Sequence, residues 1–447
     1  MLRCDAYLGK GDTYSRMMAS SRPGRQLCVD CIEYIILFGY YVFSYTEEED
    51  DMKIFHLCKA AFIFGIAGIF LFKVLCSAGT LEAANPPADE WQTIQGESRK
   101  AGRAESFLRQ VLDKSGATAL SVAVIQGPQV VFQRSMGILD KKTKRAVNEH
   151  TVFRTASLSK PVFAYLVMKL TEEGVLELDK PLYQYLKRPL YEYPEYSGLK
   201  NDDRYKLLTA RILLSHQSGF PNWRRVRPGG PLSLDFTPGE KFRYSGEGYR
   251  LLQFFLEMIT GKGLNQLSKE KIFSPLGMTN SSFLWESRFD NNFAFYSNTG
   301  LRRFLAQTKL EPNSAYSLLT NTADYSKFLL AITNGSGLKT ETVEMMLKPQ
   351  VNITSRSLHA PQETDPKIHE AIHLAWSLGW GRFRCPQGEA IFHVGFEEGC
   401  DNYAVVFLDR KTGIVIQSVI TGTEGIAPQV VKELIGDIYS PFSWLNY

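Results

Sequence analysis

The fold is decided by the stretch Phe153-Arg154-Thr155-Ala156-Ser157-Leu158-Ser159-Lys160, which precedes Pro161 and the apolar run 162–170. Apolar side chains recur in that run at helical spacing, which predicts a helix with one buried face. Pro161 fits only near a helix start, where a missing N–H costs least. Ser157 and Lys160 lie three residues apart, on one side of the first turn. A hydroxyl at a helix start, with an amine one turn away, could act as a nucleophile.

The composition is that of a folded, non-repetitive protein. The chain has 447 residues and a net charge of +4, and its length suffices for one large or two moderate cores. The charges are dispersed along the sequence, and no run of Lys or Arg suggests binding to nucleic acid. We therefore expect no nucleic-acid partner.

The first 84 residues are expected to form an N-terminal extension. From Met52 onward the sequence is typical of a secretory signal, with a basic start, the apolar run 60–72 and small residues at 77–79. One hypothesis takes Met52 as the true start and residues 1–51 as an artefact of the gene structure. The alternative keeps the whole chain and uses residues 60–76 as an uncleaved membrane anchor, although Lys73 interrupts it. Both place the signal or anchor at about residues 52–78 and the body outside the cytoplasm, either exported to the periplasm or exterior or attached to a membrane.

The cysteines divide unevenly between the extension and the body. Five of the seven precede Asn85, and Cys28 and Cys31 have a zinc or redox spacing but no second pair nearby to complete a site. Cys385 and Cys400 could form one disulfide or remain two free thiols. Both possibilities stay open at this point.

The body is expected to be one α+β domain over residues 96–447. Helices are expected at 98–114, 208–214, 248–258, 322–333 and 428–439, and strands at 119–125, 129–133, 375–381, 390–394, 403–408 and 414–420. Strands near both ends with helices between them predict an antiparallel sheet flanked by helices. The sheet would use about residues 96–175 and 340–447, and a mainly helical insertion would occupy about 176–339.

Two further motifs follow the Ser-x-x-Lys stretch. Tyr244 lies in a Gly-rich turn before an expected helix, and His393-Val394-Gly395 closes an expected strand. In this order and spacing the motifs resemble the active-site motifs of penicillin-recognising serine enzymes. The chain resembles the class C β-lactamase and low-molecular-weight penicillin-binding-protein family, including its esterase and D-peptidase branches, from about residue 96 to the C-terminus. Further signatures that look like this family occur at residues 213–219, 275–278 and 376–381.

The resemblance implies a β-lactamase/transpeptidase-like fold and an acyl-enzyme formed on Ser157. Lys160 and Tyr244 would share the proton transfer, and the sequence does not show which of them is the base. The substrate would be a small molecule or a peptide, such as a D-alanyl peptide, a small ester or a β-lactam. No metal or organic cofactor is implied.

The resemblance also assigns the third motif to the substrate. Backbone N–H groups of Ser157 and Phe396 would form the oxyanion hole. His393 would line the site beside the substrate, and Gly395 would let the substrate backbone approach the strand edge.

Two positions depart from the family pattern. Gly246 stands where class C enzymes usually carry an asparagine that grips the substrate, and His393 stands where a lysine usually begins the third motif. The second change removes a permanent positive charge from the place of a substrate carboxylate. Both changes weaken the expected grip on a β-lactam and are compatible with an esterase or a peptidase.

Four alternatives compete with this interpretation. Lys411-Thr412-Gly413 spells the family's third motif, but its surroundings predict a hairpin turn. His369-Glu370-Ala371-Ile372-His373 matches a zinc-protease signature, which needs a helix and a third ligand. His216 is interpreted as a structural residue at a helix end. Finally, the chain could be a non-catalytic or penicillin-binding protein on the same fold.

Overall fold

The computed structural model describes residues 89–141, 144–224, 231–295, 311–362, 367, 369–420, 425–436 and 441–447. All of them belong to the unit Pro86–Tyr447, one of two into which the chain divides. The signal or anchor expected at residues 52–78, the rest of the extension 1–84, and the Cys28/Cys31 pair lie outside the described residues. Among the helices of the described ranges, none has the length and apolar character needed to cross a membrane.

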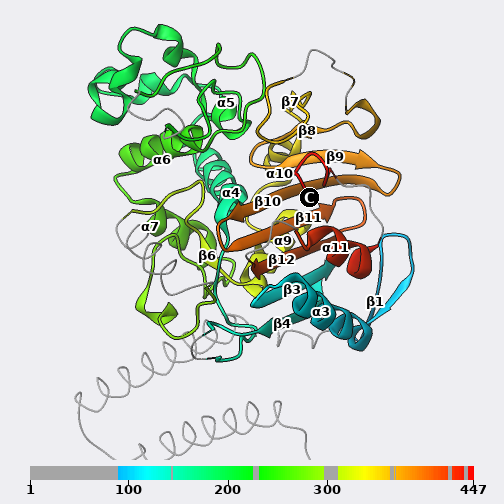
Figure 1. Ribbon diagram of the computed structural model, residues 1–447. Coiled ribbons are helices and arrows are strands. Elements are labelled where there is room, and N and C mark those ends of the chain that lie inside the picture. Colours follow the sequence, from blue (N-terminus) through cyan, green and yellow to red (C-terminus); the bar gives the residue numbers. More distant parts are fainter. Residues whose placement is uncertain are drawn as a thin grey trace, which may run out of the picture. The chain divides into compact units, whose positions relative to one another are not determined.

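The centre of this unit is an antiparallel sheet of eight strands (Figure 1). In spatial order they are β4 (Gln129–Gly137), β3 (Ala119–Gln126), β12 (Thr412–Val419), β11 (Cys400–Phe407), β10 (Gly388–Glu397), β9 (Gly381–Cys385), β8 (Ala375–Trp376) and β7 (Val351–Asn352). The early β3–β4 hairpin pairs with β12 near the C-terminal end. The α+β fold with an antiparallel sheet flanked by helices is therefore confirmed.

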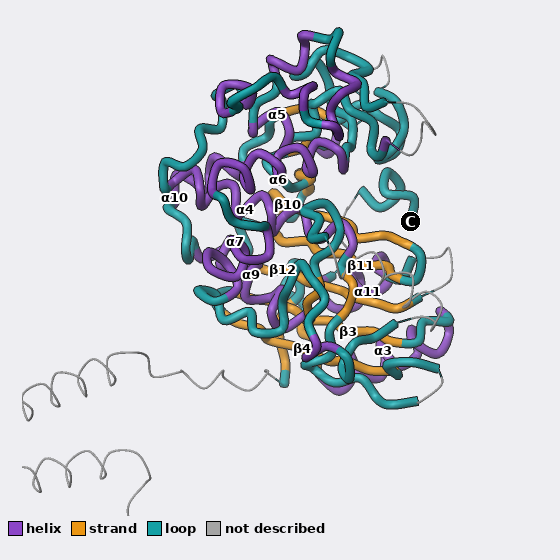
Figure 2. Tube along the Cα trace, turned by 90° about the vertical axis from the view of Figure 1, so that its left-hand side faces the viewer, coloured by secondary structure: helices purple, strands orange, loops and turns teal. Residues whose placement is uncertain are grey.

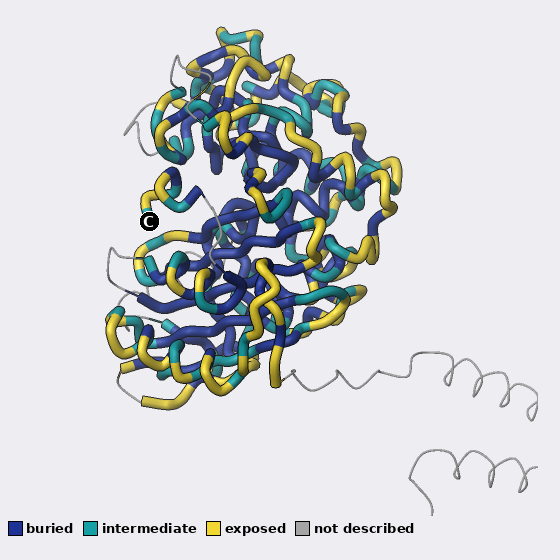
Figure 3. Tube along the Cα trace, turned by 90° about the vertical axis from the view of Figure 1, so that its right-hand side faces the viewer, coloured by how far each residue is buried: buried dark blue, intermediate teal, exposed yellow. Residues whose placement is uncertain are grey.

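Helices cover both faces of the sheet, as Figure 2 shows. Alternate side chains of β3 enter two different cores, since successive residues of a strand point to opposite faces. Val122 and Val124 pack with α3 (Ala101–Ser115) and α11 (Ala427–Ile435), while Ala123 and Ile125 pack in the core of α4 (Ser159–Glu172). The same core as α4 also takes residues of α9 (Thr322–Asn334) and α10 (Thr340–Leu347). Figure 3 shows the resulting buried strands between more exposed outer segments.

A mainly helical region lies between α4 and α9. It contains α5 (Ala210–Leu214), α6 (Gly246–Thr260), α7 (Leu264–Ser268), the π-helical turn Lys269–Phe273 and several 3₁₀ turns. In the described part of residues 176–339, the only strand is β6 (Leu319–Thr320), which pairs with β5 (Phe153–Arg154). This pairing brings the loop before β6 to the start of the Ser-x-x-Lys segment.

Two expected helices have different bounds in the structure. Residues Ser98–Lys100 form strand β2 against β1 (Glu90–Gln92), and α3 begins only at Ala101. Arg99 is held there in extended backbone because it pairs with Trp91 and its Nε donates to the Glu433 carbonyl at 2.7 Å. The last helix ends at Ile435, since Gly436 has a φ of 110°, which right-handed helix does not allow.

Candidate active site

Ser157 lies in a 3₁₀ turn, Ala156–Leu158, that leads directly into α4. Ala156 before it has a φ of 47°, an unfavourable conformation for a residue other than glycine. Two hydrogen bonds hold this turn: Ser159 Oγ donates to the Ala156 carbonyl at 2.6 Å, and the Leu318 N–H donates to Ser159 Oγ at 3.0 Å. Ser157 itself is partly exposed. The fold therefore presents its hydroxyl on a fixed and strained turn.

Lys160 contacts the hydroxyl of Ser157 from the next turn. Its Nζ lies 2.9 Å from Ser157 Oγ and 2.8 Å from the carbonyl oxygen of Ala315. The side chain has no solvent exposure, and this burial lowers the pKa of Lys160 to about 7, opposed by the charge of Glu397. A large fraction of Lys160 is therefore a neutral amine at neutral pH, able to accept the Ser157 proton.

Tyr244 completes the predicted group. Its ring centroid lies 4.7 Å from Lys160 Nζ, and the side chain is 5% exposed. Burial raises the pKa of Tyr244 well above its usual value, and the neighbouring Ser157 hydroxyl lowers it by less. The geometry between the two hydroxyls falls short of a hydrogen bond, and Tyr244 Oη has no other partner among the described residues. Tyr244 is therefore a protonated phenol at neutral pH, next to the reacting serine.

The Ala315 carbonyl is supplied by a loop that polar contacts hold in place. Ala315 N–H donates to Asn313 Oδ1 at 2.9 Å, and Ser317 Oγ accepts from the Asn313 N–H and donates to the Phe283 carbonyl, both at 2.8 Å. Phe283 N–H in turn donates to Asn265 Oδ1 of α7 at 2.7 Å. The sequence interpretation missed this loop, because a backbone carbonyl leaves no residue-type signal.

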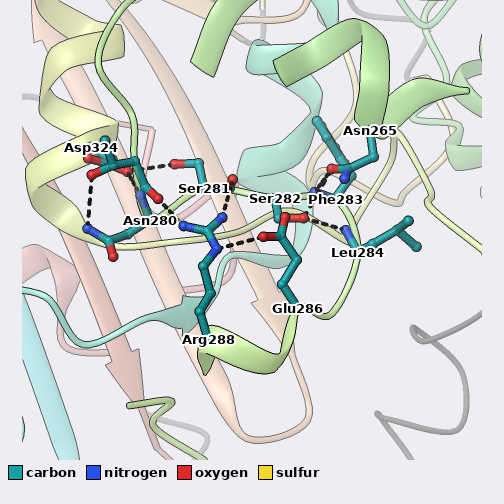
Figure 4. Close-up of polar contacts among 10 residues, drawn as sticks. Asn265, Asn280, Ser281, Ser282, Phe283, Leu284, Glu286, Arg288 and Asp324 are labelled. Atoms are coloured by element: carbon teal, nitrogen blue, oxygen red, sulfur yellow. Dashed lines mark hydrogen bonds and ion pairs between the residues drawn. The ribbon is translucent and has the colours of Figure 1, made fainter. Parts of the chain in front are cut away.

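Figure 4 shows the wider polar network around residues 280–284, the segment that contains Phe283. Asp324 of α9 accepts from the Asn280 N–H at 2.6 Å and from Ser281 Oγ at 3.0 Å. Arg288 Nη2 donates to the Ser281 carbonyl at 3.1 Å. Helices α7 and α9 thereby fix the segment that supports the Lys160 contact.

The structure places His393 next to Tyr244, and its expected place beside the substrate stays a prediction. The structure buries it completely, with ring contacts to Trp376 at 5.5 Å and to Tyr244 at 6.2 Å between centroids. Its Nδ1 donates to the Val394 carbonyl at 2.7 Å, which leaves Nε2 without a proton. Burial and the charge of Lys160 lower the pKa of His393 to about 3. His393 is therefore a neutral support of Tyr244.

Gly395 lies directly against the nucleophile turn. A Cβ at this position would lie 2.2 Å from the Thr155 carbonyl oxygen and 3.2 Å from the Leu158 nitrogen. The missing side chain lets β10 approach this turn, and the expected approach of a substrate backbone to the same strand edge stays a prediction. Phe396 follows with 66% of its side chain exposed. Its predicted oxyanion role stays a prediction, supported by this close approach.

Two further histidines surround the Tyr244 ring. The His216 ring lies 4.3 Å from the Tyr244 ring between centroids, and its Nδ1 accepts from the Ser245 N–H at 3.0 Å. Burial is the main reason why the pKa of His216 lies well below its usual value. His216 thus supports Tyr244 as well as following the end of α5. The sequence interpretation missed His359, an exposed loop residue whose ring lies edge-on to Tyr244 at 5.5 Å.

The indole of Trp223 packs directly against Gly246. A Cβ on Gly246 would lie 2.6 Å from Trp223 Cη2, so the space of a side chain at this position is already filled. No spacing in the sequence pointed to Trp223, because the contact joins a loop residue to the first residue of α6.

The structure also settles the conformation of the two competing motifs. Lys411 is the last residue of the turn 408–411 between β11 and β12, and Thr412 and Gly413 begin β12, at the opposite end of β11 from the Gly395–Asn402 pair. Within the zinc-protease signature, Glu370–Ile372 is a 3₁₀ turn and His373 has a φ of 46°. The α-helical turn that this signature requires is therefore not formed.

The two body cysteines are separate thiols. Cys385 and Cys400 are both buried and unbonded. Burial raises the pKa of Cys400 to about 12, so its thiol stays protonated.

A family model described as Beta-lactamase matches residues 104–430. The chain belongs to the beta-lactamase family. It is 26% identical over 210 residues to Esterase EstB of Burkholderia gladioli, covering 41% of this chain and 52% of that protein. It is 30% identical over 189 residues to the D-alanyl-D-alanine-carboxypeptidase/endopeptidase AmpH of Escherichia coli K12, covering 38% and 46%. The matches thus span about half the length of these two relatives.

A longer match joins the chain to Penicillin-binding protein 4* of Bacillus subtilis. The two are 22% identical over 329 residues, which cover 68% of this chain and 69% of that protein. Among solved structures, the hydrolase EstCE1 has a TM-score of 0.61 at 17% identity, covering 75% of this chain and 98% of that one. The octameric penicillin-binding protein homologue from Pyrococcus abyssi has a TM-score of 0.58 at 20% identity, covering 74% and 76%. These likenesses confirm the β-lactamase/transpeptidase fold.

Proposed function

We propose that the chain is a serine hydrolase that forms an acyl-enzyme on Ser157. The observation that carries this proposal is the 2.9 Å contact between Ser157 Oγ and the fully buried Nζ of Lys160. A nucleophile activated by a neighbouring base is the common arrangement of covalent hydrolases. The family's relatives described as an esterase, a carboxypeptidase and a D-aminopeptidase support the same reaction class.

Lys160 is the proposed base. Burial lowers its pKa to about 7 and raises that of Tyr244, so near neutral pH the amine accepts a proton more readily than a phenolate forms. Ser157 Oγ attacks the carbonyl carbon as its proton passes to Lys160 Nζ. The oxyanion would be held by the N–H groups of Ser157 and Phe396.

Tyr244 is the proposed proton relay. As the tetrahedral intermediate collapses, the bond to the leaving group breaks and the proton on Lys160 passes to that group, with the Tyr244 hydroxyl as an intermediate donor. Water then attacks the acyl-enzyme, with Lys160 again as base, and the acid product and free Ser157 are regenerated. The substrate class is an ester or an amide, including D-amino-acid amides and β-lactams.

Covalent labelling tests this proposal. A fluorophosphonate should add its mass to the wild-type protein and not to Ser157→Ala. Lys160→Met should lower the rate of labelling about 10²- to 10⁴-fold. Lys169→Met is the matched control on the same helix, because its Nζ contacts only surface groups such as the Gly337 carbonyl. Equal labelling of the wild type and Ser157→Ala would overturn the proposal.

Turnover separates a hydrolase from a penicillin-binding protein. Intact mass is followed over time after mixing with a p-nitrophenyl ester, a D-alanyl-D-alanine peptide and penicillin. A hydrolase gives a transient adduct and continuing product release with at least one of them. An adduct that persists with all three favours the penicillin-binding alternative.

We also propose export, on the signal-like pattern from Met52 to residue 79. The alternative is attachment to a membrane through the same segment. N-terminal sequencing of the mature protein distinguishes them: a start between residues 78 and 85 supports export with cleavage, and an intact apolar run contradicts it.

A further inference from the structure

Lys160 and Tyr244, which perform the proposed proton transfer, are buried, whereas the rings of Trp223 and Tyr316 are partly exposed. Lys160 and His393 have no exposure, and Tyr244 is 5% exposed. Trp223 and Tyr316 are partly buried hydrophobics that pack against the core containing α4. These two rings are therefore more accessible to a substrate than the catalytic amine is.

The residues immediately before and after Trp223 are both hydrogen-bonded to the start of α6. Asn222 accepts the Gly246 N–H through its backbone oxygen and through Oδ1, each at 3.0 Å. Arg224 donates through Nη2 to Glu247 at 2.6 Å, and the Glu247 carboxylate is 1% exposed. The indole between these anchors is positioned by the fold.

The indole fills the space beside the catalytic tyrosine's loop. Gly246 is two residues after Tyr244, and any side chain there would meet Trp223 ring atoms at 2.6–2.9 Å. An apolar surface thus replaces a hydrogen-bonding side chain at this place.

Tyr316 extends that surface to the catalytic lysine. Its ring meets the Trp223 ring edge-on at 5.6 Å between centroids. Tyr316 directly follows Ala315, whose carbonyl lies 2.8 Å from Lys160 Nζ. The aromatic pair Trp223/Tyr316 therefore begins one residue from a group that touches the catalytic amine.

Three cations among the described residues near the nucleophile turn and the aromatic pair have partners. Arg224 is bound to Glu247, and Arg154 forms an ion pair with Glu397 beside β10. Lys160 is engaged with Ser157 and the Ala315 carbonyl. A substrate carboxylate that paired with one of these three groups would have to displace its present contact, whereas an uncharged apolar group displaces none.

We propose that Trp223 and Tyr316 determine substrate specificity, forming the wall that receives an uncharged, apolar or aromatic acyl group on the carbonyl attacked by Ser157. This inference rests on the proposed acyl-enzyme. Burial of an apolar acyl group against two rings favours the transition state of such esters, and a charged acyl terminus would lose its hydration there while Arg224, Arg154 and Lys160 stay engaged with their own partners.

The test compares p-nitrophenyl esters that share one leaving group. The phenylacetate and the acetate differ by a phenyl group, and the hexanoate and the hydrogen adipate differ by a terminal carboxylate. For the wild type we expect kcat/KM to be about tenfold or more higher for the phenylacetate and for the hexanoate than for their partners. Trp223→Ala and Tyr316→Ala should lower the phenylacetate value about fivefold or more and the acetate value by less than about twofold.

A matched control and a conservative variant complete the design. Trp285→Ala removes another partly buried tryptophan, which packs on Phe289 and Phe293 in a separate cluster, and should leave the acyl preferences unchanged. Trp223→Leu keeps an apolar wall and should retain the preference for the hexanoate over the adipate. Unchanged fluorophosphonate labelling of Ser157 shows that each variant is folded.

The outcomes separate this inference from the proposed function. Absence of wild-type labelling at Ser157 overturns the proposed function and the inference together. Labelling at Ser157 overturns the inference alone if the adipate is hydrolysed as well as the hexanoate, or if Trp223→Ala and Tyr316→Ala lower acetate and phenylacetate equally.

Discussion

Two tripeptides that end in glycine lie at opposite ends of β10 and β12, the two strands that flank β11. His393-Val394-Gly395 lies near the C-terminal end of β10, where Gly395 packs against the turn that carries Ser157. Lys411-Thr412-Gly413 begins β12 at the far end of β11, where Lys411 is exposed and has a φ of 47°. Lys411-Thr412-Gly413 has the residue types expected of a substrate-binding motif, whereas His393-Val394-Gly395 has the expected position beside the nucleophile turn. Position in the sheet, rather than residue type, therefore decides which tripeptide belongs to the active site.

Substitution of the two glycines, Gly395 and Gly413, should give the largest difference between the tripeptides, because neither position has room for a Cβ. Gly395→Ala would place a Cβ 2.2 Å from the Thr155 carbonyl and push β10 away from the nucleophile turn. We expect the rate of fluorophosphonate labelling to fall about 10²-fold, since small displacements at a reacting centre have effects of that size.

Gly413→Ala is the matched variant. Its Cβ would lie 2.7 Å from the Val405 carbonyl, inside the sheet and away from Ser157. We expect it to lower the free energy of unfolding by about 1–3 kcal/mol while the folded fraction is labelled at the wild-type rate. Loss of labelling in Gly413→Ala as large as in Gly395→Ala would contradict the comparison.

The next largest difference is expected in the free energy of unfolding when the first residues of the two tripeptides, His393 and Lys411, are exchanged for each other's residue type. His393→Lys puts an amine in a fully buried place near Lys160, and we expect the free energy of unfolding at pH 7 to fall by several kcal/mol. That loss should shrink as the pH rises toward 10, because the unfolded state binds more protons than the folded one across that window.

Lys411→His, on the exposed turn, should change the free energy of unfolding by less than about 0.5 kcal/mol. Urea unfolding of both variants at pH 7 and pH 9 measures the difference. Similar free energies of unfolding for the two variants would show that the His393 site accepts a charge as readily as the surface does.

The smallest effect concerns two residues with the same left-handed backbone. Ala156, before the nucleophile, and Lys411 both have a φ of 47°. Lys411→Gly should stabilise the protein by about 0.5 kcal/mol and leave labelling unchanged. Ala156→Gly should change stability by a similar amount but slow labelling several-fold, because the turn that aims Ser157 loses its restraint. Equal labelling rates would contradict a role for that restraint.

The sequence predicted those parts of the site that depend on particular types of side chain. Ser157, Lys160 and Tyr244 could be found because the chemistry needs those side chains in that order, and the structure brings Ser157 and Lys160 into contact and Tyr244 beside them. The antiparallel sheet could be predicted from alternating β-branched runs. The place of His393-Val394-Gly395 followed from its position at a strand end.

The rest depends on contacts between loops that local patterns do not encode. The Ala315 carbonyl contributes a backbone atom, and its position depends on Asn313 and on distant residues of α7 and α9. His359 and Trp223 reach the site from irregular segments. The burial of His393 follows from the packing of Trp376 and Tyr244 around it, which a single strand does not reveal.

The most direct test of the account is the pH dependence of Ser157 labelling by a neutral fluorophosphonate, with Ser157→Ala as the blank. Because burial lowers the pKa of Lys160 to about 7, the fraction of neutral amine rises through that pH. The account predicts a labelling rate that is half-maximal near pH 7 and level between pH 8 and 9, with the rise abolished in Lys160→Met. A rate that keeps increasing about tenfold per pH unit up to pH 10, as for a lysine of ordinary pKa, would contradict it.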